Sequence, residues 1–189
     1  MRYLIDTCAI SELSARKTSE DVRRWFASVP DVDLYLSVVT IGELRKGIDR
    51  LSEDDPLRQR LEGWFSSVRS VFAGRILEFD ERIAIAWGKI VGESMRLGKP
   101  RPAVDAQLAA TAFVNGMVLV TQNEKDFEHT GVQILNPYFT HGRGMNAARQ
   151  GLRRFGRTTG TRTRAASSDC SVRAVSFGPL QKHNLSSCR

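Results

Sequence analysis

The sequence predicts an α/β fold in which a mainly parallel sheet is covered by helices on both sides. Short aliphatic or β-branched runs, typical of buried strands, alternate with longer stretches whose apolar residues recur every three to four positions. This alternation favours a parallel sheet, because parallel neighbours need a crossover connection and a helix usually supplies it. With 189 residues, the chain is long enough for one domain with a well-filled core.

The individual elements are predicted from the spacing of apolar residues. A strand buried on both faces is a short unbroken apolar run, whereas a helix that covers a sheet has a single apolar stripe. The strands are expected at 3–5, 34–39, 76–77, 117–120 and 132–135. The helical spacing occurs at 22–29, 57–68, 83–91 and 108–113.

Charge is divided unevenly along the chain, whose net charge is +7. Ten of the 28 basic residues but only one of the 21 acidic residues lie in residues 140–189, so this segment carries +9 and residues 1–139 carry −2. The segment is rich in Gly, Ser, Thr and Arg without an apolar period, which predicts a disordered basic tail. An RNA-binding arm is the alternative. The basic net charge therefore describes the tail and not the predicted domain.

Several classes of protein are excluded by composition. No apolar run reaches the roughly 18 residues that cross a bilayer, and an acid at position 6 interrupts the N-terminus too early for a signal peptide. The three cysteines are too far apart for a zinc site or a disulfide framework. Glycine-rich nucleotide loops and a nucleophile–histidine pair are also missing. We expect a cytoplasmic protein that has no contact with membranes.

Four acidic residues follow predicted strands or open a helix beside them. Asp6 directly follows the first strand, Glu43 lies just past the second, Asp105 opens a helix, and Asp126 follows the fourth strand. Because the carboxyl ends of parallel strands meet at one edge, we expect these side chains to converge there. Carboxylates so placed repel one another unless a cation lies among them. Oxygen ligands favour Mg²⁺ or Mn²⁺, which would activate water and orient a phosphodiester.

Taken singly, three of these acids also have a purely structural explanation. Thr40 and Glu43 have the spacing of a capping box, in which the Glu satisfies a helix N-terminus. Asp105 would stabilise the first turn of a helix through the helix dipole, and Asp126 would be an ordinary loop acid. Asp6 has no capping role evident in the sequence. The four acids together favour the metal site.

The acids lie in four segments that follow one another in a recognisable order. These are Leu4–Glu12, Ser37–Gly47, Asp105–Ala112 and Thr121–Phe127, closed by Leu135-Asn136-Pro137. Together they resemble PIN-domain ribonucleases, and more narrowly the VapC/FitB-type toxins of type II toxin–antitoxin pairs. The resemblance covers about residues 1–138. It implies a PIN-like three-layer α/β/α domain over residues 1–139.

The resemblance also implies an activity and partners. It implies a Mg²⁺-dependent endoribonuclease, with Mn²⁺ able to substitute, that hydrolyses structured RNA such as tRNA and leaves 3′-hydroxyl and 5′-phosphate ends. A VapB-type antitoxin and a homodimer are implied as partners. Two other functions stay open on the same scaffold: a non-catalytic RNA-binding or toxin–antitoxin regulatory protein, and a PIN nuclease of RNA processing. The basic tail is either a read-through or frameshift extension or a lineage-specific arm.

Roles for individual residues follow from the same resemblance. The fourth ligand position belongs to Asn123 or Asp126, and we favour Asp126 because Asn123 is neutral. Thr7 and Thr121 match polar positions near the metal and would help to hold water or phosphate. Cys8 stands where the family commonly has Asn, which leaves every carboxylate in place. The residues expected to bind metal and carry catalysis are Asp6, Glu43, Asp105 and Asp126.

Overall fold

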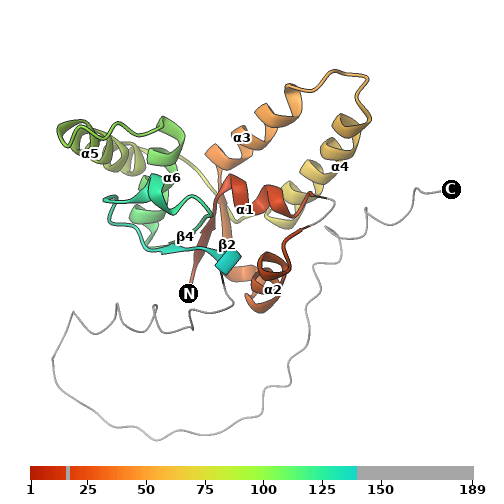
Figure 1. Cartoon of the computed structure of the whole chain (residues 1–189), viewed down its shortest axis with the longest axis horizontal. Helices are drawn as coiled ribbons and strands as arrows, with labels where there is room; N and C mark the ends of the chain where they lie inside the picture. The colour runs from red at the N-terminus through yellow and green to blue at the C-terminus, as the bar shows by residue number, and fades with distance from the viewer. Residues whose placement is uncertain (16–17, 140–189) are drawn as a thin grey trace, which may run out of the picture.

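A five-stranded parallel sheet forms the centre of the domain (Figure 1). The computed structural model describes residues 1–15 and 18–139, so the prediction of a disordered tail falls outside the described residues. The strands run in the order β3-β2-β1-β4-β5, and every neighbouring pair is parallel. The parallel α/β fold is therefore confirmed. The strands are β1 (Tyr3–Ile5), β2 (Leu34–Ser37), β3 (Ile76–Leu77), β4 (Val118–Val120) and β5 (Ile134–Leu135).

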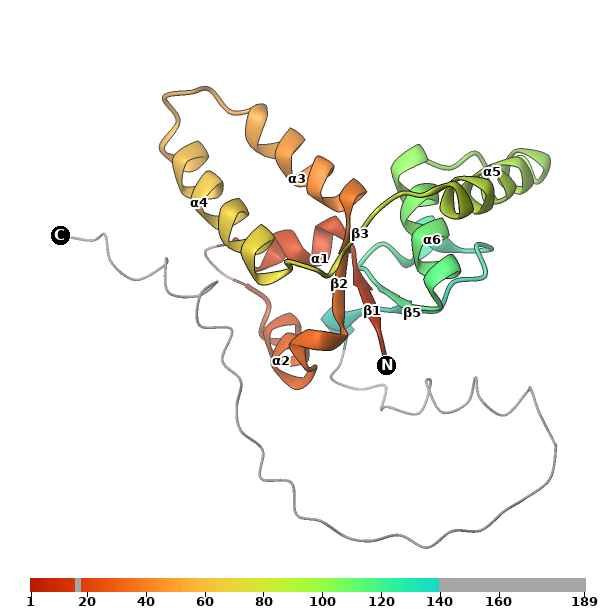
Figure 2. The ribbon, with the colours of Figure 1, turned by 180° about the vertical axis from the view of Figure 1, so that it is seen from behind.

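Helices cover both faces of the sheet, as the views from the two sides show (Figures 1 and 2). Alternate strand residues point to opposite faces: Ile5 and Val120 join the core under α1 to α4, whereas Leu4 and Leu119 join the core under α6. No described helix is both long and apolar enough to cross a membrane. The helices are α1 (Thr7–Glu12), α2 (Glu20–Ser28), α3 (Val38–Asp49), α4 (Pro56–Val71), α5 (Glu81–Arg96) and α6 (Ala103–Asn115), with 3₁₀ turns η1 (Asp31–Asp33), η2 (Glu124–Phe127) and η3 (Pro137–Phe139).

The second predicted strand, 34–39, is two residues too long. β2 ends at Ser37, whose side-chain oxygen accepts the backbone N–H of Val39 at 3.2 Å and so caps α3. The two valines that looked like a continuation of the strand instead open this helix, because a serine cap satisfies a free N–H of its first turn. The fourth and fifth predicted strands are also shorter than expected, beginning at Val118 and Ile134.

The order in which strands are added to the sheet reverses at β1. From this central strand, β2 and β3 extend the sheet one way, while β4 and β5 extend it the other way. In parallel sheets, ligands bind beyond the carboxyl ends of the strands at such a reversal. Because Ile5 pairs with Val120, the residues that follow them, Asp6 and Thr121, lie side by side at this edge.

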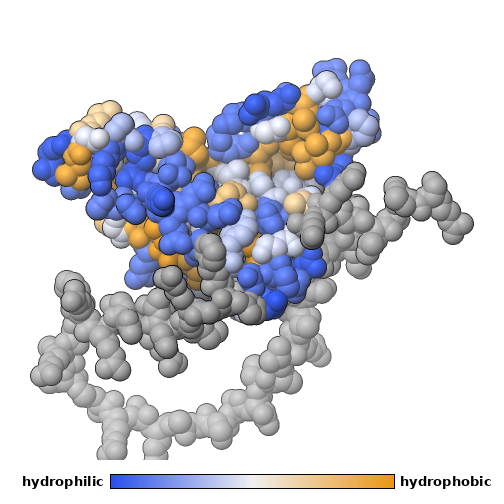
Figure 3. All heavy atoms as spheres, in the orientation of Figure 1, coloured by the Kyte–Doolittle hydropathy of each residue, from blue (hydrophilic) through white to orange (hydrophobic). Residues whose placement is uncertain are grey.

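Two helical arms extend from this edge of the sheet and diverge, one formed by α3 and α4 and the other by α5 and α6 (Figure 2). The surface is notched between the arms (Figure 3). On the visible face, hydrophilic side chains dominate the α5–α6 arm, whereas apolar side chains gather between α3 and α4 (Figure 3).

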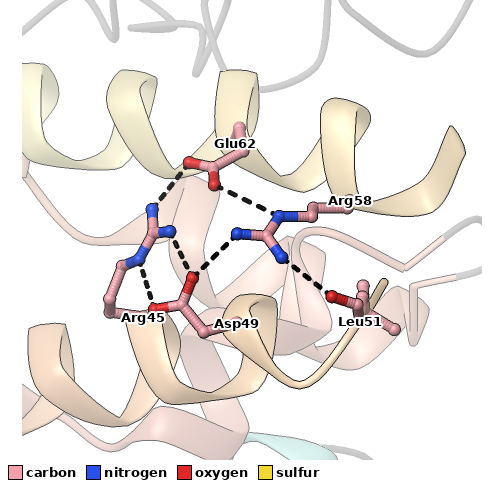
Figure 4. Close-up of polar contacts among 5 residues, drawn as sticks. All are labelled: Arg45, Asp49, Leu51, Arg58 and Glu62. Carbon is pink, nitrogen blue, oxygen red and sulfur yellow. Dashed lines mark hydrogen bonds and ion pairs between the residues drawn. The ribbon is translucent and has the colours of Figure 1, made fainter. Parts of the chain in front are cut away.

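Four charged side chains tie α3 to α4, and we call them the charge ring: Arg45, Asp49, Arg58 and Glu62 (Figure 4). Arg45 bonds both oxygens of Asp49 and donates to Glu62 at 2.8 Å. Arg58 donates to Asp49 at 3.2 Å and lies 3.9 Å from Glu62. It also donates to the carbonyl of Leu51, between the helices, at 2.8 Å. Each charge of the ring therefore faces an opposite one.

Candidate active site

Asp6 lies at the carboxyl end of β1 and is only 6% exposed. Its Oδ1 accepts the backbone N–H of Thr7 at 2.5 Å, and its Oδ2 accepts the Thr121 hydroxyl at 2.6 Å and the Cys8 thiol at 3.2 Å. The first bond makes Asp6 the N-cap of α1, so the expectation that it has no capping role was wrong. Six residues of helix are too few to reveal an apolar period in the sequence. All three donors are neutral, so they orient the carboxylate without balancing its charge.

Two neighbours complete the surroundings of Asp6. Burial and the charge of Asp6 raise the pKa of the Cys8 thiol to about 11, so it stays protonated at neutral pH and serves as a donor. Its sulfur also accepts the backbone N–H of Gln122 at 3.4 Å, which joins the ends of β1 and β4. The Thr7 hydroxyl oxygen is buried and has no hydrogen-bond partner within the described part of the chain. It offers a position for a water or phosphate oxygen.

The loop after β4 places Asn123 and Asp126. The Thr121 hydroxyl oxygen accepts the backbone N–H of Asn123 at 3.0 Å, and the Asn123 carbonyl accepts the N–H of Asp126 at 3.1 Å. Phe127 is 2% exposed and anchors η2 in the core beside α6. The side chains of Asn123 and Asp126 remain exposed and line the same surface pocket. A buried aromatic residue thus holds an exposed acid in place.

Asp105 lies in the first turn of α6. Burial, together with the negative charges of Asp126, Asp6 and Glu43, raises its pKa to about 6 against the opposing charge of Arg101. A helix dipole acting alone would favour the ionised carboxylate in this turn. The burial of Asp105 and the repulsion from neighbouring carboxylates favour its protonated form instead. The structure brings the four predicted acids into one electrostatic neighbourhood.

Glu43 reaches this neighbourhood from the second turn of α3. The capping-box alternative is wrong, because α3 begins at Val38 and Thr40 lies inside the helix. Both carboxylate oxygens of Glu43 accept hydrogen bonds from Lys46 Nζ at 2.6 Å. The Lys46 side chain is 60% exposed. Such an exposed pair within one helix is weak, so Lys46 can move away at little cost.

The arrangement fits a divalent cation in its chemistry, although no three potential ligands among the described residues are gathered closely enough to hold an ion. The donors are carboxylate oxygens, which suit Mg²⁺ and Mn²⁺. Their mutual repulsion, seen in the pKa of Asp105, is the electrostatic condition that an ion would relieve. The unpartnered Thr7 hydroxyl adds a further oxygen.

Comparison with known proteins decides the family. Residues 3–133 match the PIN domain family. The chain is a member of that family. Toxin FitB from Neisseria gonorrhoeae is 36% identical over 138 residues, which span 71% of this chain and 97% of that toxin. The plasmid stability protein StbB from Pseudomonas syringae is 33% identical, with the same coverage of both chains. A VapC ribonuclease from Sinorhizobium fredii is 31% identical over 71% of this chain and 96% of its own.

Solved structures agree with this assignment to the PIN family. The crystal structure of FitAcB from Neisseria gonorrhoeae superposes with a TM-score of 0.68 at 33% identity, covering 72% of this chain and 99% of that one. DNA-bound VapBC from Salmonella typhimurium superposes with a TM-score of 0.61 at 26% identity, covering 72% of this chain and 98% of that one. The PIN fold and the resemblance to VapC/FitB toxins are thereby confirmed.

Three contacts of this PIN domain were missed by sequence reasoning. Nothing in the sequence indicates that Cys8 bonds to Asp6 and across to the β4 loop. The pairing of Glu43 with Lys46 could have been found, because residues three apart on a helix are neighbours.

Proposed function

We propose that this PIN domain is the endoribonuclease toxin of a type II toxin–antitoxin pair, acting in the cytoplasm on structured RNA such as tRNA. Family membership and the ribonuclease relatives support the reaction class. A relative from Shigella flexneri, 26% identical over 131 residues, is a tRNA(fMet)-specific endonuclease. The observation that carries the catalytic assignment is that the charges of Asp126, Asp6 and Glu43 all act on the carboxyl group of Asp105.

The proposed metal is Mg²⁺, for which Mn²⁺ could substitute. When bound, the ion would supply positive charge that polarises a phosphodiester and lowers the pKa of a water molecule. The residues that would hold it are Asp6, Glu43 and Asp105, with Asp126 completing the set. Asp126 is preferred over Asn123 because its charge is felt by Asp105, whereas Asn123 contributes backbone contacts to the loop.

The chain's own groups prepare this set of acids. The Thr121 hydroxyl and the Thr7 N–H hold the two oxygens of Asp6 in fixed directions. The Thr7 hydroxyl is free to hold a water or phosphate oxygen. Lys46 covers Glu43 in the present arrangement and has to release it before the carboxylate can serve as a ligand.

A VapB-type antitoxin is the proposed protein partner, and the toxin is proposed to be a homodimer. The neighbouring solved structures include FitAB bound to a DNA fragment, at 34% identity, and VapBC bound to DNA. The cluster of negative charges around Asp105 is suited to a basic side chain of such an antitoxin when RNA is absent. Light scattering of the isolated toxin tests the dimer.

Cleavage by the purified chain tests the enzyme, with Asp6→Asn as the decisive variant. Asparagine caps a helix about as well as aspartate, so α1 should survive the change. Asp54→Asn, at an exposed loop position, is the matched control. We expect wild type and D54N to cut RNA in Mg²⁺, to leave 5′-phosphate ends and to arrest growth without antitoxin. D6N should do none of these. Cleavage that persists in EDTA, or in D6N, would overturn the proposal.

A further inference from the structure

Three basic side chains from two loops meet at the base of the α5–α6 arm. Lys99 and Arg101 belong to the loop between α5 and α6, and His129 follows η2. Lys99 Nζ lies 3.4 Å from His129 Nε2. Arg101 donates to the carbonyl of Glu128 at 2.7 Å and reaches the hydroxyl of the buried Ser94 at 3.4 Å. Arg101 therefore joins the two loops and holds Lys99 and His129 side by side.

Lys99 and Arg101 carry the positive charge of this group, and His129 adds a ring nitrogen beside Lys99. Among the described residues, neither Lys99 nor Arg101 nor His129 forms an ion pair. Lys99 and His129 are exposed, and Arg101 uses two of its five N–H donors in the contacts above. The charge of Arg101 is felt by Asp105, so the group lies beside the carboxylates.

His129 has a strained backbone conformation. Its φ is +62°, and it is the one residue other than glycine with positive φ in the described part of the chain. Side chains with a Cβ adopt this region at a cost, and such strain is concentrated at binding and catalytic sites. In this conformation the imidazole lies next to the Lys99 ammonium group.

We propose that Lys99, Arg101 and His129 form a phosphate-binding subsite that holds the RNA backbone beside the carboxylates. The inference rests on the proposed ribonuclease function. Residues 1–139 carry a net charge of −2, and carboxylates without a bound cation repel a phosphodiester, so cationic side chains beside them would favour RNA binding. Ammonium and guanidinium groups are the usual phosphate donors, and most protein–nucleic acid hydrogen bonds go to phosphate or sugar.

Affinity for RNA, measured apart from cleavage, tests the subsite. The full chain is titrated against a fluorescein-labelled RNA hairpin in EDTA, and anisotropy is followed at several salt concentrations. The variants are Lys99→Gln and His129→Asn, since asparagine tolerates positive φ, together with their combination. Lys89→Gln is the matched control, because it removes one exposed positive charge from α5 outside the group.

We expect K99Q to weaken binding by about 3- to 10-fold and to reduce the slope of log affinity against log salt by about one. The double variant should bind still more weakly, and K89Q should match wild type. Equal RNA affinities for K99Q and K89Q would overturn the subsite. Different results would contradict the nuclease proposal and the subsite proposal. RNA that binds through the subsite but is never cut contradicts the nuclease, whereas normal cleavage with unaltered binding by the double variant contradicts the subsite.

Discussion

Two aspartates on opposite arms of the molecule have pKa values shifted in opposite directions. Hydrogen bonds from Arg45 lower the pKa of Asp49 in the charge ring. Burial and the charges of Asp126 and Asp6 raise the pKa of Asp105 to about 6. The chain supplies opposite charges where acids only hold helices together, as between α3 and α4. At the sheet edge, several acids act on one another with fewer opposite charges among them, which is an arrangement that suits a bound cation.

The largest expected difference between the two aspartates is in catalysis. Asp105→Asn should reduce RNA cleavage by more than about 100-fold, since changes to residues that only orient a metal ligand already cost about 10- to 100-fold. Asp49→Asn should leave the rate near that of wild type, because the ring does not contact the carboxylate site. Initial rates at saturating Mg²⁺ measure both. Equal losses would mean that the ring is part of the catalytic machinery.

Removing the hydroxyl that orients Asp6 should have the next largest effect on cleavage. Thr121→Val keeps the shape of the side chain but deletes the 2.6 Å hydrogen bond to Asp6, so we expect cleavage to fall about 10- to 100-fold. Thr121→Ser restores the hydroxyl and should recover most of the rate. Titration of both variants with Mn²⁺ should show weaker metal binding for valine alone. If valine and serine behave alike, the hydroxyl does not position the ligand.

Mg²⁺ should stabilise the folded state only when the carboxylates are intact. An ion that binds the native state alone adds about 2.7 kcal/mol at a hundredfold excess over its Kd. Thermal melts with and without Mg²⁺ should therefore show an increase in Tm for wild type and D49N but not for D105N. A Tm increase in D105N as large as in wild type would place the bound ion elsewhere.

The smallest expected difference between the two aspartates is in how the free energy of unfolding depends on pH. Because the native pKa of Asp105 is above the ordinary value of 3.8 for an aspartate, the folded state binds a proton more tightly than the unfolded state does. Its contribution is present at low pH and is lost as pH rises through about 6. D105N should raise stability at pH 7 by on the order of 1 kcal/mol, since solvent screens a half-buried carboxyl.

Asp49 has the opposite sign, because its lowered pKa gives stability that is lost on acidification. Urea melts at several pH values should show that D105N removes a loss of stability as pH rises from 4 to 7, whereas D49N removes a loss as pH falls below about 4. Identical pH profiles for the two variants would contradict the comparison between the arms.

The alternation of buried runs and apolar stripes was sufficient to predict the fold class. The ends of elements were less predictable, as at Val38 and Val39, where one hydroxyl at Ser37 changes an apparent strand into a helix. All four acids of the candidate site could be proposed from the sequence, because each lies in a segment that resembles the family. The charge ring could not be proposed from the sequence, because Arg45 and Glu62 lie on different helices and come together only when these helices pack.

The sequence by itself determined the composition of the site: which acids are present, and that the basic charge is concentrated in residues 140–189 rather than in the domain. The tertiary structure decided which charges and hydrogen-bond donors surround those acids. Parallel pairing of β1 with β4 sets Asp6 beside Thr121, and the packing of η2 on α6 brings Asp126 near Asp105. Charges interact through space, so their pKa shifts follow from distances that only the folded chain defines.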